Sequence, residues 1–222
     1  MVYPFVEYGL FLALCYAERE ALSDTTTFSI VFEAADKLRH LQDVVYYSFE
    51  LVEAFPGFDD SGSQEAWQND PVWQGARAAV EHIIALDDWM EVVVATNLCF
   101  DRLFGELAKV AYFSRFAAAN GDVVTPIIIA SSEADTSRTR RWTTALMEHV
   151  LHDRTHGRGN LEIVNSWVEK WNGYARQACD AFAPVFDGAP RQPATYSSAM
   201  ADVAAKQGAH LGGLGLAVPP TA

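Results

Sequence analysis

Apolar residues recur at helical spacing along most of this chain, whereas the strict alternation of a half-buried β-strand is almost absent. The pattern predicts a first helix over residues 6–22 and a second over residues 28–52, with a Ser/Asp/Thr-rich loop between them that suits an N-cap. The second helix is expected to end at residues 55–58, because the proline and glycine there interrupt helical structure. The chain therefore begins with two helices joined by a short loop.

The rest of the chain shows the same helical spacing, interrupted by short segments rich in Gly, Pro, Asp and Asn. Residues 123–129 differ, because they contain the only β-branched run, and the embedded Pro126 favours an extended buried connection over a strand. In chain order, the expected elements are an acidic loop over 59–69, a helical region that begins at Asp70-Pro71 and extends with a kink to Ala119, a turn at 120–122, the extended segment 123–129, a helix over 132–152, a break at 157–159, a helix over 161–182 and a last helix over 196–210.

Five or six long helices with short connections predict an all-α bundle. We divide the chain into a helical domain over residues 1–187 and a C-terminal part over residues 188–222, which comprises a Pro/Gly-rich linker, the last helix and a frayed tail from residue 212. With 222 residues, the chain is long enough to bury a core without disulfides or a structural metal.

Composition narrows the function classes. The chain has 16 Lys and Arg against 29 Asp and Glu, a formal net charge of −13, and no basic cluster, which argues against nucleic-acid binding. The apolar run over residues 8–17 is too short to span a membrane and lacks the basic start of a signal peptide. Three scattered cysteines fit a reducing environment. We therefore expect a cytoplasmic protein that binds neither nucleic acid nor a membrane.

A di-metal carboxylate centre in a helical bundle needs a Glu from each of two helices and a Glu-x-x-His motif from each of two others. None of the six histidines has Glu three residues before it, and the only carboxylate at that offset is Asp153, before His156. Lys37 stands three residues before His40, and its ammonium would repel iron and could occupy the place of the cation. The sequence therefore predicts no metal, cofactor or catalytic residue in this chain.

The helix over residues 28–52 carries a polar stripe opposite a heptad-like apolar stripe. The apolar stripe consists of Phe28, Val31, Ala35, Leu38, Val45, Phe49 and Val52. The polar stripe consists of Glu33, Asp36, Lys37, His40 and Asp43. Three interpretations of the polar stripe remain open: a stripe without chemistry, supported by pairs such as Glu33 with Lys37; a former metal face now filled by ion pairs; or a working metal site.

Two other segments of the chain carry possible metal ligands. His149, His152 and His156 have the spacing of ligands on one helix face, but two arginines lie among them, which favours a solvated helix end over a zinc site. Residues 57–63 fail the spacing of a calcium loop, and the chain has no serine-hydrolase or nucleotide-binding motif.

A set of separate segments, in order along residues 7–171, carries a family resemblance. They include EYGLF (7–11), YAEREALSD (16–24), DKLRHLQD (36–43), PGFD (56–59), WQNDPVWQ (67–74), ATN (95–97) and ANGD (119–122). Together they resemble the β (small) subunit of the hydroxylase component of soluble bacterial di-iron monooxygenases, especially the propane and tetrahydrofuran monooxygenase branch.

The resemblance implies a ferritin-like, ribonucleotide-reductase-like helical bundle without a metal centre. In this family, α subunits bind two irons and activate O₂, and β subunits join them in an (αβ)₂ or (αβγ)₂ hydroxylase. A reductase with FAD and an iron–sulfur cluster and a small coupling protein complete the NADH-dependent system. The implied function is that of a non-catalytic structural β subunit of an enzyme that inserts one oxygen atom of O₂ into a small hydrocarbon, such as a propane-like alkane, an alkene or a cyclic ether. The implied vestigial counterparts of metal positions are Glu7, Lys37, His40, Asp153 and His156.

Two other functions remain open: an unrelated helical interaction protein, and a self-sufficient ferritin-like metalloenzyme with ligands outside Glu-x-x-His. The chain departs from the family at its start, since relatives carry a long arm before the first helix and Met1 here lies six residues before Glu7. A shortened form, a truncated chain or a misplaced start would each explain this. With 50% apolar and 20% charged residues, the chain is expected to share apolar surface with a larger subunit and to aggregate or self-associate when expressed alone.

Overall fold

The computed structural model describes residues 1–219, and this part of the chain consists of helices and their connections, which confirms the predicted all-α architecture. In chain order, the elements are α1 (Pro4–Glu20), α2 (Asp24–Ala54), α3 (Ser63–Asn69), α4 (Pro71–Ile84), α5 (Trp89–Val93), the π-helical segment η1 (Val94–Ser114), α6 (Arg115–Ala119), α7 (Val124–Leu151), α8 (Gly157–Phe182), α9 (Val185–Gly188) and α10 (Tyr196–Gly213).

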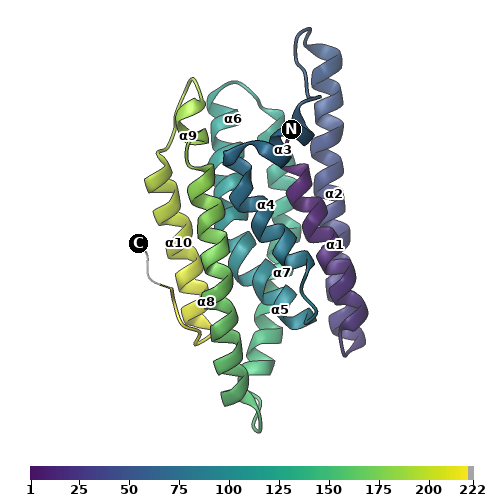
Figure 1. Cartoon of the computed structure of the whole chain (residues 1–222), viewed down its shortest axis with the longest axis vertical. Coiled ribbons are helices and arrows are strands. Elements are labelled where there is room, and N and C mark those ends of the chain that lie inside the picture. The colour runs from purple at the N-terminus through teal and green to yellow at the C-terminus, as the bar shows by residue number, and fades with distance from the viewer. Residues whose placement is uncertain (220–222) are drawn as a thin grey trace.

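The long helices lie side by side, with α1 and α2 paired at one edge and α10 at the other (Figure 1). The segment η1 lies in the middle of the bundle, where α4, α7, α8 and α10 pack against it. Residues 92–109 are buried on all sides of the helix, except for Asp101 and Arg102, which are half-buried. A helix that is apolar on nearly every face is stable only when it is surrounded in this way.

Polar caps start the helices where the sequence indicates. The Ser23 hydroxyl accepts a hydrogen bond from the backbone N–H of Thr26, and the Asp70 carboxylate accepts one from Val72. The turns at Gly57 and Gly121 have φ values of +98° and +94°, a region that glycine adopts without steric cost. The predicted breaks at residues 55–58 and 120–122 are therefore confirmed.

Two predicted connections are helical instead. The acidic loop over 59–69 contains α3, and the extended segment over 123–129 is the start of α7. Pro126 is tolerated there because the first turn of a helix has no intrahelical partners for its N–H groups. Asp122 caps this turn by accepting from the N–H groups of Val124 and Thr125.

Other boundaries are shifted. The helical region predicted over 71–119 is interrupted at residues 85–88, where Asp88 caps α5. The break expected at 157–159 lies instead at 152–156, and Gly157 begins α8. A Cβ on Gly157 would lie 2.5 Å from the carbonyl oxygen of Leu151, so glycine is needed for close packing rather than for a break.

The C-terminal part packs on the bundle for most of its length. Helix α10 extends to Gly213, and Leu214 and Leu216 are only 6% and 4% exposed, so the expected fraying from residue 212 is wrong at these positions. The Gln207 amide donates to the carbonyl oxygen of Leu98 in η1 and to the side chain of Asn172 in α8. The end of the expected tail, residues 220–222, lies outside the described residues.

The two faces of α2 are inverted relative to an ordinary amphipathic helix. Glu33, Lys37 and His40 of the polar stripe are buried, with 2%, 4% and 6% of their surface exposed. By contrast, Phe28 and Phe49 of the apolar stripe are 62% and 67% exposed. The polar stripe therefore faces the inside of the bundle, and much of the apolar stripe faces outward.

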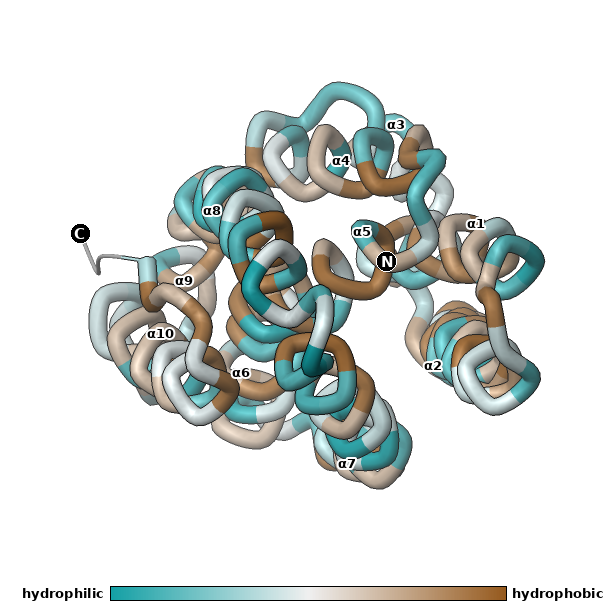
Figure 2. Tube along the Cα trace, turned by 90° about the horizontal axis from the view of Figure 1, so that it is seen from below, coloured by the Kyte–Doolittle hydropathy of each residue, from teal (hydrophilic) through white to brown (hydrophobic). Residues whose placement is uncertain are grey.

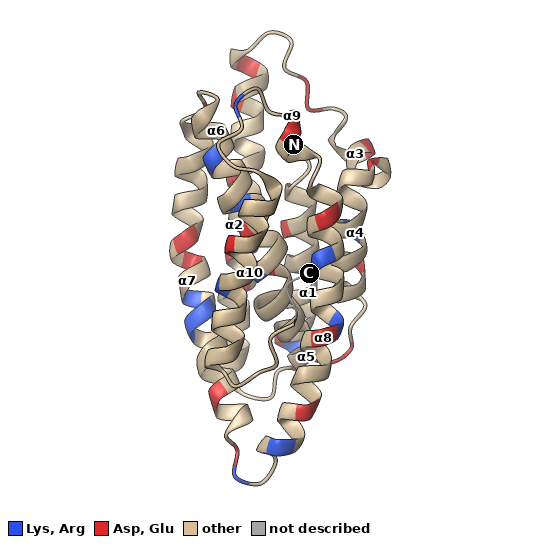
Figure 3. Ribbon diagram, turned by 90° about the vertical axis from the view of Figure 1, so that its left-hand side faces the viewer, with Lys and Arg blue, Asp and Glu red and all other residues tan. Residues whose placement is uncertain are grey.

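The distribution of charged and apolar residues over the described helices (Figure 3) gives neither a single acidic patch nor a membrane-spanning helix. Acidic residues are spread over several helices rather than gathered in one patch (Figure 3). No helix within residues 1–219 is long and apolar enough to cross a membrane. Cys15, Cys99 and Cys179 are all free thiols.

Candidate functional site

Three helical elements bring charged side chains together inside the bundle, and a fourth closes the site. Glu7 comes from α1, Glu33 and Lys37 come from α2, and Asp101 and Lys109 come from η1; these five residues are called the charged cluster below. All except Asp101 are less than 9% exposed, and the Asp101 side chain is 13% exposed. The fourth helix, α7, closes the site with polar side chains described below.

Lys37 lies at the centre of the charged cluster. Its Nζ is 2.5 Å from Oδ2 of Asp101 and 3.5 Å from Oε2 of Glu7. The Nζ of Lys109 is 3.4 Å from the other carboxylate oxygen of Glu7. The pair that the sequence favours, Glu33 with Lys37 along the helix, is replaced by these contacts to α1 and η1.

The protonation states balance the charge of the cluster. Burial alone would raise the pKa of Glu7, but the positive charges of Lys37 and Lys109 lower it to about 2. Burial would likewise lower the pKa of Lys37, but Asp101 and Glu7 raise it above its usual value. Burial raises the pKa of Glu33 to about 8, so this carboxyl is mostly protonated at pH 7. Two carboxylates then face two ammonium groups.

Two hydrogen-bonded pairs flank the charged cluster. The Asn97 amide donates to Oε2 of Glu33 at 3.0 Å and to the Thr143 hydroxyl of α7 at 3.0 Å. On the other side, Nε2 of His40 is 3.3 Å from Oδ2 of Asp135 in α7. Burial lowers the pKa of His40, which favours the neutral imidazole at pH 7. Every charged group at the centre is thus held by groups from another helix.

This donor set does not fit a divalent metal centre. Metal-binding carboxylates must be free to point at one ion, whereas Glu7 and Asp101 both point at the ammonium of Lys37. The nearby imidazole of His40 is paired with Asp135. Within residues 1–219, no group of three or more His, Cys, Asp and Glu side chains has the arrangement of a metal site. At the centre of this bundle, an ammonium supplies the positive charge.

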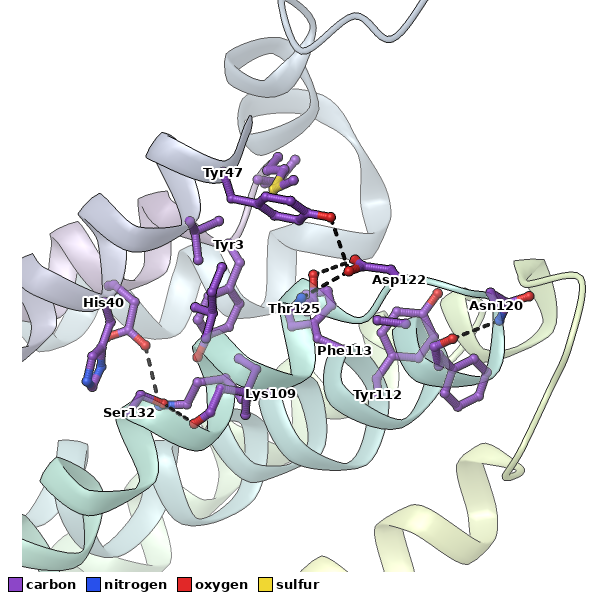
Figure 4. A pocket seen from close by; sticks show the side chains of 18 of the residues that line it. Tyr3, His40, Tyr47, Lys109, Tyr112, Phe113, Asn120, Asp122, Thr125 and Ser132 are labelled. Carbon is purple, nitrogen blue, oxygen red and sulfur yellow. Dashed lines mark hydrogen bonds and ion pairs between the residues drawn. The ribbon is translucent and has the colours of Figure 1, made fainter. Parts of the chain in front are cut away.

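A cavity of about 470 Å³ lies beside the charged cluster. Its wall is mostly aromatic and aliphatic, and Glu7, His40 and Lys109 reach it from the cluster. Figure 4 shows Tyr47 of α2 pointing across the cavity toward Asp122, to which its hydroxyl donates at 3.1 Å. The cavity offers apolar volume next to charges that are already paired with one another.

The structure brings together only part of the predicted set of vestigial positions. Glu7, Lys37 and His40 meet inside the bundle, whereas Asp153 and His156 are exposed in the α7–α8 connection. There, the Asp153 carboxylate accepts hydrogen bonds from the backbone N–H groups of Thr155 and His156. His149 and His152 are also exposed, near the end of α7.

Sequence reasoning missed Asp101 and Lys109. The signal available was their position within the mostly apolar run over residues 92–111, which also contains the charged residues Arg102 and Glu106; charged side chains in such a run are rarely buried unless they are paired. Their partners could not be read from the sequence, because Glu7 and Lys37 are distant along the chain.

Comparisons with known proteins give the family context. Residues 1–154 match the family model described as Methane/Phenol/Alkene Hydroxylase. The chain is 32% identical, over 82% of its length and 50% of the relative, to the propane 2-monooxygenase hydroxylase component small subunit of Gordonia sp. (strain TY-5). It is 34% identical, over 74% of its length and 43% of the relative, to the methane monooxygenase component A beta chain of Methylosinus trichosporium. The chain thus spans about half the length of the curated relatives it matches.

Solved structures agree on the fold. A chain of toluene 4-monooxygenase superposes with a TM-score of 0.74 at 28% identity, over 81% of this chain and 58% of that one. A chain of phenol hydroxylase from Pseudomonas sp. OX1 superposes with a TM-score of 0.81 at 20% identity, over 99% of this chain and 63% of that one. The predicted ferritin-like helical fold and the resemblance to hydroxylase β subunits are confirmed.

Proposed function

This chain belongs to the Methane/Phenol/Alkene Hydroxylase family, and we propose that it is a non-catalytic structural β subunit of a di-iron monooxygenase hydroxylase. One observation carries this proposal. The Nζ of Lys37 contacts both Glu7 and Asp101 at the centre of the bundle, so the carboxylates there neutralise a side-chain cation of the same chain. Chemistry at a metal in this position would require the removal of that cation.

The charged cluster then has a structural role, and we interpret it as a former metal face now filled by ion pairs. The ammonium of Lys37 neutralises the carboxylates of Glu7 and Asp101 inside the bundle. Without it the carboxylate of Asp101 would be unpaired, and unpaired buried charges are strongly unfavourable. No residue of the chain is assigned a catalytic role. Residues 1–187 form the ferritin-like domain in this proposal, and residues 188–222 form the C-terminal part.

The same proposal specifies the other components of the monooxygenase. A larger α subunit holds both irons and joins this chain in an (αβ)₂ or (αβγ)₂ hydroxylase in the cytoplasm. A reductase with FAD and an iron–sulfur cluster passes electrons from NADH, and a coupling protein completes the assembly. The substrate is a small hydrocarbon, and propane is favoured because relatives named as propane 2-monooxygenase subunits match over 82–91% of this chain.

The test is to produce this chain alone and together with the large subunit of the same hydroxylase, and to measure bound iron and O₂ consumption in both preparations. We expect a stable complex that binds iron and, with its reductase and coupling protein, consumes O₂ and NADH with the hydrocarbon. The chain alone should bind no stoichiometric iron after incubation with Fe²⁺. Stoichiometric iron with O₂ consumption by the chain alone would overturn the proposal, and so would the absence of a complex.

A further inference from the structure

The outward face of α2 carries a regular series of exposed residues. Going along the helix, the exposed positions follow steps of four, three, seven, four and three residues. These positions, called the outer stripe below, are Phe28, Phe32, Ala35, Gln42, Tyr46 and Phe49. The four aromatic members are 61–72% exposed, which is far above the usual exposure of large aromatic side chains.

The spacing identifies the kind of partner that the outer stripe suits. Steps of three and four residues that sum to seven are the pattern by which one helix packs along another. From Phe28 to Phe49 the stripe covers 22 residues, and the 21 steps between its ends correspond to about 31 Å of helix. Figure 2 shows α2 at the edge of the bundle, beside α1, where a further helix has access to it. The partner is therefore a helix of about six turns.

A hollow of about 300 Å³ lies between α1 and α2, and Ser48, Asp60 and Ser63 form the polar part of its lining. Its lining includes Leu41 and Val45 from α2 and Phe5 and Tyr8 from α1, and Tyr8 is 47% exposed. Side chains of a docked helix would therefore find a recess beside the stripe as well as the stripe itself.

Charges at both ends of the stripe disfavour a second copy of this chain as the partner. Asp24 is exposed at the N-terminal end, and Glu50 and Glu53 are exposed at the C-terminal end, without ion pairs in the described part of the chain. Arg39, a half-buried cation of α2, is already paired with Asp43 and Asp135. Two copies would place carboxylates against carboxylates in either the parallel or the antiparallel orientation, which is unfavourable.

We propose that the outer stripe of α2 binds one long amphipathic helix of the large hydroxylase subunit, whose apolar side packs on the stripe and whose flanks carry Lys or Arg opposite Asp24, Glu50 and Glu53. This assignment rests on the proposed function, because that function supplies the large subunit as the partner. It adds the surface by which the chain binds and the chemistry of the helix it receives.

The test measures the dissociation constant of the full chain and the large subunit by titration calorimetry. The variants Phe32→Asp and Tyr46→Asp are each expected to weaken binding at least about tenfold, as for central aromatic residues of an interface. Ile163→Asp is the matched control, because Ile163 is 49% exposed on α8, and it should change binding less than about twofold. Circular dichroism verifies folding, and Phe32→Ala replaces any aspartate variant that fails to fold.

A charge-reversal variant tests the role of the acidic residues at the C-terminal end of the outer stripe. Replacing Glu50 and Glu53 together by Lys should weaken binding, and the loss should shrink at high salt because salt screens exposed charges. If the wild-type chain binds the large subunit and both aromatic variants bind equally well, this docking surface is wrong while the proposed function stands. If the wild-type chain does not bind at all, the proposed function fails first. Disulfide crosslinking of two copies through Phe49→Cys within the complex would overturn the assignment in favour of a second copy.

Discussion

The two faces of α2 use opposite means to hold helices together. The inner face places Glu33, Lys37 and His40 among charged and polar groups of α1, η1 and α7, with which they form ion pairs and hydrogen bonds. The outer face presents Phe28, Phe32, Tyr46 and Phe49 to solvent, and within residues 1–219 they make no such contacts. Whether a side chain of α2 is buried thus depends on the partners it finds there rather than on its hydrophobicity. A charged side chain can be buried when it is paired, and an apolar side chain needs another apolar surface.

This difference determines how each face responds to substitution. The inner face is part of the fold of the single chain, so its changes are expected to alter the free energy of unfolding. The outer face contributes less to that free energy, because its aromatic side chains keep 61–72% of their surface exposed in the folded chain. The following substitutions separate the two cases.

The largest effect is expected for Lys37→Met. This variant leaves the mostly buried Asp101 without its cation and leaves Glu7 with Lys109 alone, and breaking a buried pair in this way costs about 3–5 kcal/mol. Urea denaturation followed by circular dichroism measures the loss. The control is Lys170→Met, because Lys170 is 48% exposed, so solvent screens its ion pair with Glu91 and the expected loss is below about 1 kcal/mol.

A double variant sharpens this result. Adding Asp101→Asn to Lys37→Met removes one carboxylate with the cation and leaves Glu7 paired with Lys109. The double variant should therefore be more stable than Lys37→Met alone, which is the coupling expected of groups in direct contact. Equal stability of Lys37→Met and Lys170→Met would contradict the structural role of the inner face.

A smaller effect is expected for Glu33→Gln, and it depends on pH. The pKa of Glu33 is about 8 in the folded chain, above its unfolded value near 4.5, so the folded state holds the proton more tightly. The stability contributed by this proton is fully present below pH 4.5 and is lost as the pH rises through 8. Glutamine mimics the protonated carboxyl, so the variant should be more stable than wild type by at least about 1 kcal/mol at pH 8.5.

The measurement is chemical denaturation of both proteins between pH 5 and pH 8.5. The curves should converge toward pH 5 and separate as the pH rises. Glu50→Gln is the control, because Glu50 is exposed on the outer side of the same helix and should leave the pH dependence unchanged. Parallel curves for wild type and Glu33→Gln would show that Glu33 ionises normally in the fold.

Local signals allowed most of the helices to be predicted from the sequence. Ser23, Asp70 and Asp122 act within a few residues, and the glycines at 57 and 121 require no distant partner. The start of α7 was missed because Pro126 in a β-branched run suggests an extended segment, whereas its place in the first turn removes the penalty. The interruption at residues 85–88 was missed because no proline or glycine marks it.

The candidate site was less predictable. The missing Glu-x-x-His and the unusual Lys37 are local features, and they were visible. The direction of the polar stripe was not, because an amphipathic pattern shows that two faces differ and leaves open which one has partners. The position of Lys37 between Glu7 and Asp101 depends on how α1, α2 and η1 pack, and those contacts join residues 30 and 64 positions apart.

The smallest effect on stability is expected for Phe32→Asp. Phe32 is 61% exposed, so the free energy of unfolding of the isolated chain should change by less than about 0.5 kcal/mol. Its effect on association should be clear, since exposed aromatic surface promotes contacts between copies, and high salt strengthens them by screening the net charge of −13. Sedimentation velocity at low and high salt measures this association. Wild type should self-associate at high salt and Phe32→Asp less so, with Ile163→Asp as the control for adding one charge elsewhere. A loss of stability as large as that of Lys37→Met would show that the outer face is part of the fold of the single chain, and the contrast between the two faces would then be wrong.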